Sequence, residues 1–140
     1  MRWTNGEFAI DDDRARLDME RILGRLAQSY WAGTTPRDAV RTSWERAGVT
    51  LGVYRGEELI GCARAVTDFA RFAYLSDVYI DPPYRGRGLG QWLVETMIAH
   101  PAVPGVRWVL HTNDAHGLYG EFGFEAPDET VMQRPKPERG

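Results

Sequence analysis

The residues with the clearest chemical potential form a basic, glycine-rich turn at positions 85–90, directly after a strand-like segment. The turn reads Arg85-Gly86-Arg87-Gly88-Leu89-Gly90, and two prolines separate it from the apolar residues before it. A helix that begins with glycines leaves backbone N–H groups unpaired at its positive end, where they bind phosphate. Two arginines add positive charge there, although Arg87 reads equally well as a solvated surface charge. The turn therefore predicts a ligand that carries phosphate.

Two common phosphate-binding motifs do not match this turn. A Walker P-loop ends in Gly-Lys-Ser/Thr, whereas Leu89, Gly90 and Gln91 follow Gly88 here. A dinucleotide fingerprint requires a third glycine where Gln91 stands, together with a parallel sheet. The strands expected before the turn are joined by short turns, which indicates hairpins. The residues at positions 89–91 therefore exclude both motifs.

The periodicity of apolar residues predicts the elements that position this turn. Helical spacing predicts a first helix that begins after Asp11-Asp12-Asp13 and reaches Tyr30, and a second that starts at Thr35-Pro36 and ends near Gly48. Apolar runs and short turns then predict antiparallel strands at residues 49–54, 59–66 and 72–80.

The remainder of the chain predicts a crossover and a closing helix. After the turn we expect a helix at 89–100, a strand at 106–111, a short helix at 114–122, and two last strands at Phe124 and 130–133. The sum is an α+β (mixed α/β) fold. Its single domain is expected over residues 1–133, with a disordered tail over 134–140.

Bulk properties exclude several functional classes. The 140 residues fit one domain, and a net charge of −3 argues against a general nucleic-acid binder. No apolar run approaches the ~20 residues that span a bilayer, and the N-terminus lacks the apolar core of a signal peptide. The single cysteine, Cys62, allows no intrachain disulfide and no thiolate cluster for zinc. We expect a cytoplasmic protein without a metal, and a homodimer is compatible with the sequence.

Two motifs together resemble the GNAT superfamily of N-acetyltransferases. The family's acyl-CoA signature, Arg/Gln-x-x-Gly-x-Gly/Ala, is met by Arg85, Gly88 and Gly90. About thirty residues downstream, Asn113 and the segment 119–124 (Tyr-Gly-Glu-Phe-Gly-Phe) match the family's closing helix. The order of the expected elements also agrees, so the resemblance covers nearly the whole chain.

The resemblance implies a fold and a co-substrate. It implies a mostly antiparallel sheet of six to seven strands, splayed at an acyl-CoA cleft and flanked by four helices, with acetyl-CoA as co-substrate. Pantetheine would pair with the free backbone edge of the strand at 78–80, and the pyrophosphate would meet the N–H groups of the turn. The residues implied to bind acetyl-CoA are Val78, Tyr79, Ile80, Arg85, Gly86, Arg87, Gly88, Leu89, Gly90, Asn113 and Tyr119.

The chemistry of acetyl transfer gives roles to some of these residues. The family's proton donor to the departing sulfur corresponds to Tyr119, whose phenol suits that role, and a backbone N–H near Ile80 would polarise the thioester carbonyl. Cys62 lies within a strand and has no neighbouring base, so we expect a buried thiol and direct attack by the amine in a ternary complex. A non-catalytic sensor that binds acyl-CoA is the alternative.

The general base is less constrained by the sequence. The glutamate that many relatives carry before the glycine turn corresponds to Ser76, and Asp77 is the nearest carboxylate. Strand alternation places these two side chains on opposite faces, unless a bulge changes the parity. Asp77 is our catalytic candidate, with His111, His116 or a water molecule as alternatives.

Aromatic residues predict the acceptor side of the cleft. Tyr30 and Trp31 are adjacent, so they cannot both face the core, and Phe72 and Tyr74 share one face of their strand. An aromatic wall near Asp68 or Asp77 would suit a cationic amine. We expect a small-molecule amine or a peptide amine as acceptor, and the sequence does not decide between them.

Overall fold

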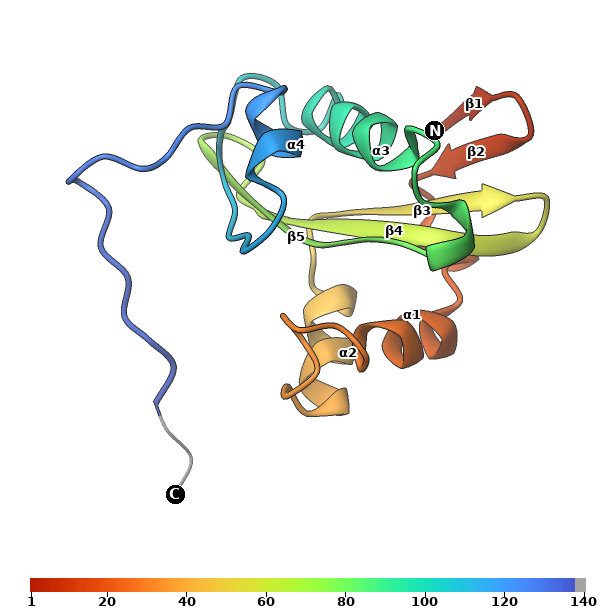
Figure 1. Ribbon diagram of the computed structural model, residues 1–140, viewed down its shortest axis with the longest axis horizontal. Helices are drawn as coiled ribbons and strands as arrows, with labels where there is room; N and C mark the ends of the chain where they lie inside the picture. Colours follow the sequence, from red (N-terminus) through yellow and green to blue (C-terminus); the bar gives the residue numbers. More distant parts are fainter. Residues whose placement is uncertain (138–140) are drawn as a thin grey trace.

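The computed structural model describes residues 1–137, and its centre is a six-stranded sheet with helices on both faces (Figure 1). The strands lie in sequence order, and every pair is antiparallel except β5 with β6. Their bounds are β1 (Arg2–Asn5), β2 (Phe8–Asp11), β3 (Val49–Arg55), β4 (Glu58–Thr67), β5 (Phe72–Ile80) and β6 (Arg107–Val109). The predicted mixed α+β fold with a mostly antiparallel sheet is confirmed.

Four α-helices cover this sheet, with α1 and α2 on one face and α3 and α4 on the other (Figure 1). They are α1 (Met19–Leu26), α2 (Arg37–Glu45), α3 (Leu89–Ile98) and α4 (His116–Gly120), and the 3₁₀ turns η1 (Arg14–Arg16) and η2 (Pro82–Tyr84) precede α1 and α3. The Asp18 carboxylate caps α1 by accepting from the Arg21 N–H. Arg14 donates to the carbonyls of Trp44 and Ala47, which fixes the end of α2.

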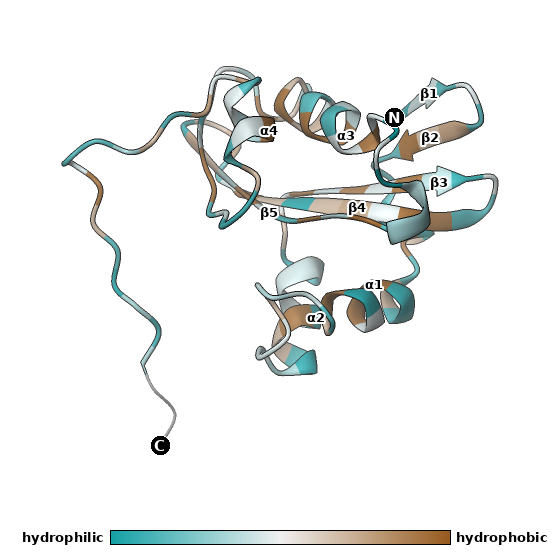
Figure 2. Ribbon diagram, viewed as in Figure 1, coloured by the Kyte–Doolittle hydropathy of each residue, from teal (hydrophilic) through white to brown (hydrophobic). Residues whose placement is uncertain are grey.

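Each face of the sheet has its own hydrophobic core. Leu93, Val94 and Met97 of α3 pack on Ile60 and Leu75. On the opposite face, a second cluster joins the two N-terminal helices to the sheet and includes Ile22, Leu26, Trp44, Tyr54 and Cys62. The hydropathy colouring of the ribbon marks apolar residues along the strands and on the helices that cover the sheet (Figure 2). The two cores fix the position of β4 and β5 between the helical layers.

The parallel pair β5–β6 opens the sheet. Only Phe72, Ala73 and Tyr74 of β5 pair with β6, although β5 continues to Ile80. Because β6 ends at Val109, the two strands are unpaired beyond Tyr74. The backbone of β5 from Leu75 onward therefore has a free edge on the β6 side.

Three elements expected from the sequence are absent. The long first helix is replaced by η1 and α1, which ends at Leu26, and the hairpin β1–β2 before it was not anticipated. No strand forms at Phe124, whose N–H donates to the Tyr119 carbonyl at the end of α4. None forms at 130–133, where Asp128 accepts from the Thr130 N–H through its side chain and from the Val131 N–H through its carbonyl, which makes a turn. Residues 134–137 of the expected tail have no helix or strand, and 138–140 lie outside the described residues.

Among residues 1–137, no helix combines the length and the apolar composition needed to cross a lipid bilayer.

Candidate active site

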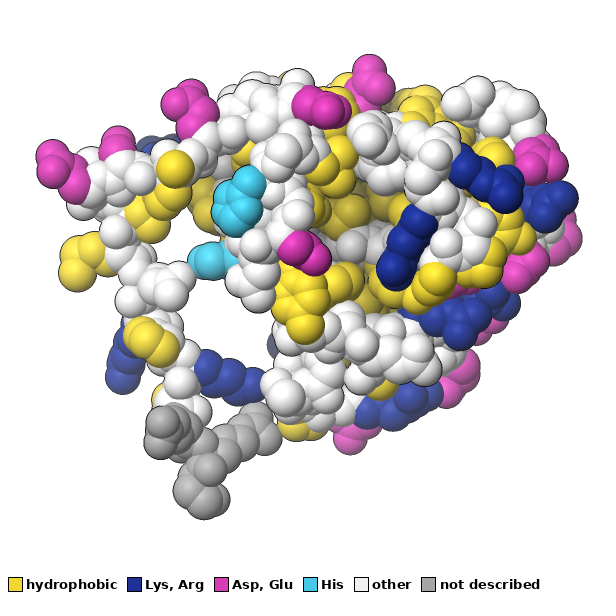
Figure 3. Space-filling model, in the orientation of Figure 1, with side chains coloured by type: hydrophobic (Ala, Val, Ile, Leu, Met, Phe, Trp, Pro, Cys, Tyr) yellow, Lys and Arg dark blue, Asp and Glu magenta, His cyan; other side chains and the backbone are white. Residues whose placement is uncertain are grey.

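A cleft of about 940 Å³ lies between the loop joining α1 to α2, the free edge of β5, the glycine turn and α4. Figure 3 shows this side of the molecule, with hydrophobic side chains in a hollow near its centre. Most of the predicted site residues line the cleft: Tyr30, Trp31, Tyr74, Asp77, Val78, Tyr79, Ile80, Arg85, Gly86, Gly88, Leu89, Gly90 and Tyr119. The predicted Phe72, Arg87 and Asn113 do not line it, nor does Asp68.

A bulge in β5 determines where Asp77 points. Arg64 of β4 pairs with Ser76 while Cys62 pairs with Tyr79, so β5 carries one extra residue in this interval. Asp77 has a φ of +55°, a left-handed conformation that aspartate adopts more readily than most residues. The bulge brings Asp77 to the face of Ser76, and Arg64 contacts both side chains. The simple alternation expected from the sequence therefore does not hold here.

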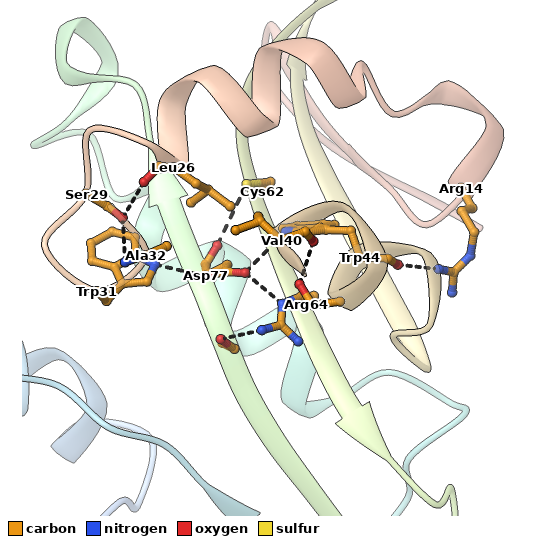
Figure 4. Close-up of polar contacts among 12 residues, drawn as sticks. Arg14, Leu26, Ser29, Trp31, Ala32, Val40, Trp44, Cys62, Arg64 and Asp77 are labelled. Carbon is orange, nitrogen blue, oxygen red and sulfur yellow. Dashed lines mark hydrogen bonds and ion pairs between the residues drawn. The ribbon is translucent and has the colours of Figure 1, made fainter. Parts of the chain in front are cut away.

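The Asp77 carboxylate joins four segments of the chain (Figure 4). It accepts hydrogen bonds from the indole Nε1 of Trp31 at 2.9 Å and of Trp44 at 3.2 Å, and it forms an ion pair with Arg64 Nε at 2.7 Å. Its side chain is only 5% exposed. A buried carboxylate requires such partners, and here all three are donors. Asp77 therefore holds Trp31 at the cleft wall.

The free edge of β5 directs backbone groups into the cleft. The Asp81 N–H donates to Ile60 of β4 at 2.7 Å. Because successive backbone groups alternate in direction, those of Ile80 and Val78 point away from β4, toward the cleft. The Ile80 carbonyl accepts a hydrogen bond from Arg85 Nε at 2.8 Å on that side. This edge has the pattern that an extended amide-containing ligand recognises.

The glycine turn leads into the start of α3 beside this edge. Gly86 and Gly88 have φ values of +78° and +79°, which glycine adopts without strain. No side chain caps the N-terminus of α3, and a Cβ placed on Gly90 would meet nothing within 4 Å. The first N–H groups of α3 are therefore free of side-chain acceptors and lie beside open space. Such a helix start attracts an anion.

The two arginines of the turn have different positions. The Arg85 guanidinium lies over the Tyr79 ring, with its carbon 5.5 Å from the ring centroid, and both residues line the cleft. Arg87 lies over the Tyr84 ring at 5.6 Å and is exposed outside the cleft. The alternative reading of Arg87 as a surface charge agrees with this position.

Tyr119 lies on α4 and faces the cleft from the side opposite β5. Its ring packs edge-on against Phe124, with 5.8 Å between the centroids. Burial raises the pKa of Tyr119 to about 12, and the neighbouring Tyr30 and Asp114 add to this shift. The phenol therefore keeps its proton at neutral pH, which suits a proton donor and not a base.

Tyr30 and Trp31 form an aromatic wall of the cleft. Their rings meet edge-to-face with centroids 5.1 Å apart, and Tyr30 donates a hydrogen bond to the Asp114 carboxylate at 3.1 Å. Asp114 lies in the segment that leads into α4. The α1–α2 loop and the start of α4 therefore meet across the cleft.

The two histidines considered as the general base differ in their access to the cleft. His111 lines the cleft, and its Nδ1 lies 2.5 Å from the Tyr74 hydroxyl while its Nε2 lies 3.0 Å from the Gln133 side chain. His116 is exposed on α4 and does not line the cleft. Of the histidines considered, only His111 therefore has access to a ligand in the cleft.

Arg64 is a cleft residue that was not predicted from the sequence. It stands between Ala63 and Ala65 in a strand that is otherwise nearly apolar, and both alanines face the α3 core. A lone arginine within such a run has to be paired or to face a cavity. The arginine between two alanines was therefore the feature of the sequence that could have identified this residue. In the structure Arg64 is both paired with Asp77 and exposed to the cleft.

Comparison with known proteins gives a consistent result. The model of a family described as acetyltransferase (GNAT) matches residues 17–124. A candidate acetyltransferase from Gibberella zeae is 31% identical over 145 residues, which cover 85% of this chain and 79% of the relative. The crystal structure of a candidate GNAT acetyltransferase from Xanthomonas campestris superposes with a TM-score of 0.87 at 34% identity, covering 93% of this chain and 94% of that one.

A more distant structure shares the fold. A GNAT-family acetyltransferase from Streptococcus pneumoniae superposes with a TM-score of 0.75 over 94% of this chain and 99% of its own. Its sequence is 21% identical, so this likeness concerns the fold alone.

Proposed function

The chain belongs to the GNAT family of acetyltransferases, and on that premise we propose that it transfers an acetyl group from acetyl-CoA to a primary amine. The observation that carries this proposal is one continuous cleft that joins the free edge of β5, the uncapped start of α3 and the phenol of Tyr119. These three features would bind amides, bind phosphate and donate a proton, which are the tasks that a CoA thioester requires.

The residues present fit acetyl-CoA as the co-substrate. The backbone groups of Val78 and Ile80 would pair with the amides of the pantetheine arm, as an added strand does. The first N–H groups of α3 and the charge of Arg85 would hold the pyrophosphate, and the open space at Gly90 leaves room for it. Bound there, acetyl-CoA supplies the activated acetyl group.

The protein's contribution to the reaction is orientation, polarisation and proton supply. A β5 backbone N–H polarises the carbonyl that the amine attacks, and Tyr119 donates its proton to the departing sulfur. An acyl-enzyme is disfavoured because Cys62 is buried, and that burial raises the pKa of its thiol well above the ordinary value. The amine therefore attacks directly in a ternary complex.

Asp77 orders the acceptor site in this proposal and does not act as the base. Its two oxygens receive three hydrogen bonds from donors and the side chain is only 5% exposed, so an amine in the cleft has little access to them. The incoming amine loses its proton to water or to the pair formed by Tyr74 and His111, whose hydroxyl and Nδ1 are 2.5 Å apart.

An acceptor screen tests the proposed function. Purified protein is incubated with acetyl-CoA and a panel of primary amines, and release of free thiol is measured. The proposal predicts thiol release that depends on the amine. Binding of acetyl-CoA without transfer to any amine would favour the alternative, a non-catalytic acyl-CoA sensor.

A further inference from the structure

Arg64 presents unused hydrogen-bond donors to the acceptor side of the cleft. Its Nε pairs with Asp77, and its Nη2 donates to Ser76 Oγ at 3.1 Å. Among residues 1–137, Arg64 Nη1 forms no hydrogen bond, and this atom is not sealed from solvent. The side chain is 14% exposed and lines the cleft. A guanidinium has five N–H groups, so most of its donor capacity is free.

The surroundings of Arg64 offer donors and few acceptors. The Ser76 hydroxyl accepts from Arg64 and keeps its own hydrogen available. The oxygens of Asp77 are taken up by Trp31, Trp44 and Arg64. The expectation that Asp77 would attract a cationic amine does not fit this arrangement, because the carboxylate is already neutralised. This part of the cleft floor is suited to an anionic group.

We propose that Arg64 and Ser76 bind a carboxylate of the acceptor, so that the substrate is a small amine that also carries a carboxylate, in other words an amino acid. This inference rests on the proposed acetyl transfer. Arginine binds carboxylates through parallel N–H groups, and a serine hydroxyl completes such a site. A phosphate group fits less well, because Arg64 is already paired with Asp77 and, within the described part of the chain, no further cation lies there to balance a second negative charge.

The spacing along β5 agrees with an amino acid. Ser76 precedes Val78 by two residues with the bulge between them, so they lie at most about 7 Å apart along the strand. The backbone of Val78 faces the cleft where the thioester carbonyl would be polarised. An anion held at Ser76 and an amine that attacks beside Val78 are therefore a few bonds apart in one small molecule. A lysine side chain within a peptide carries no carboxylate at that distance.

Matched acceptors test this inference. Each of the twenty amino acids is compared with its carboxamide and its decarboxylated amine, and phosphoethanolamine is included, with thiol release from acetyl-CoA as the readout. We expect at least one amino acid to exceed its carboxamide in kcat/KM by about 100-fold, since a site built for a polar group rejects analogues that lack it. Equal or better turnover of the carboxamides, the amines or phosphoethanolamine overturns the inference.

Two variants separate recognition from a purely structural role. Arg64→Lys keeps a positive charge near Asp77 but loses the planar fork, and Ser76→Ala removes one donor. In both, KM for the amino acid should rise about tenfold or more, the preference for the amino acid over its carboxamide should fall, and KM for acetyl-CoA should be retained. An equal loss for acid and carboxamide would show that Arg64 acts only on the structure.

The failures of the two proposals are distinguishable. Acetylation of amines that lack a carboxylate, and of no amino acid, overturns the carboxylate site and leaves acetyl transfer intact. When no amine reacts, acetyl transfer fails, and calorimetry of amino acids added to the CoA-loaded protein decides the second question. An absence of binding there overturns the carboxylate site as well.

Discussion

The indole N–H of Trp31 donates to the Asp77 carboxylate across 2.9 Å, from a loop between two helices to a bulge in the central strand. This bond joins the aromatic wall proposed to face the acceptor to the strand that would hold the thioester. Trp31 is 40% exposed, so its ring is only partly held by packing. Its position therefore depends on this charge-assisted hydrogen bond as well as on its contact with Tyr30.

Replacement of Trp31 by Phe should loosen the acceptor site and leave the acetyl-CoA site intact. The ring is largely kept, but a hydrogen bond to a charged group is lost, which is worth about 1.5–3 kcal/mol. We expect a several-fold higher KM for the amine and an unchanged Kd for acetyl-CoA, measured by steady-state kinetics and calorimetry. Trp44→Phe is the matched control, because Trp44 donates to the same carboxylate but is buried outside the cleft. It should lower stability more and affect the amine KM less.

Asp77→Asn separates an ordering role from a base. Asparagine tolerates the positive φ, but the substitution leaves the Arg64 charge unpaired, which costs roughly 3–5 kcal/mol of stability. In this variant kcat/KM should still rise with pH as it does in the wild type, because the base lies elsewhere. Removing Arg64 as well, in an Asp77→Asn/Arg64→Met variant, should recover part of the stability in urea unfolding. Disappearance of the pH dependence in Asp77→Asn would identify Asp77 as the base after all.

Gly90→Ala should stabilise the protein and weaken acetyl-CoA binding at once. Alanine favours the helix by about 0.8–1 kcal/mol over glycine, and its Cβ meets nothing within 4 Å. The methyl group would occupy the space proposed for the pyrophosphate, so Kd for acetyl-CoA should rise at least tenfold. Gly24→Ala in α1 is the matched control, since its Cβ also meets open space and Gly24 does not line the cleft. Equal affinity in both variants would count against the phosphate site.

The glycine turn and the helix after it were predictable from the sequence because their signals are local. Gly86 and Gly88 need a positive φ, and the apolar residues of α3 follow helical spacing. Tyr119 was reached only through the family resemblance, since nothing local in the sequence brings α4 opposite β5. Most of the residues predicted for the site thus line the cleft, although they make up fewer than half of its lining.

The bulge at Asp77 and the role of Arg64 could not be predicted in the same way. Both depend on the register of β4 against β5, and a single inserted residue reverses the face of a side chain. The strand predicted at 130–133 failed for a related reason. Its β-forming residues are outweighed by the turn at Asp128, which satisfies the Thr130 N–H locally.

Asp68 should contribute to the acid sensitivity of the fold. Backbone N–H groups of Arg71, Ala70 and Phe72 donate to its carboxylate and lower its pKa to about 2. A carboxyl whose pKa is depressed in the folded state stabilises the fold above its unfolded pKa of about 3.9, and this stability is lost as the pH falls toward 2. Asp68→Asn, which can still accept these bonds, should show a smaller loss of Tm between pH 4 and pH 2. An unchanged acid profile would contradict this assignment.

Tyr119→Phe should slow acetyl transfer while preserving the cleft. The phenol is half-buried and its pKa is raised to about 12, so it stays protonated across the accessible pH range. Loss of a general acid typically costs 10²–10⁴-fold in rate, and we expect that loss in kcat with little change in the Kd for acetyl-CoA. Because a thiol of low pKa leaves without help, an activated aryl thioester should restore much of the rate to the variant. Ionisation of Tyr119 should also not lower the wild-type rate at any pH below about 11. Equal kcat values for the variant and the wild type with acetyl-CoA would remove Tyr119 from the mechanism.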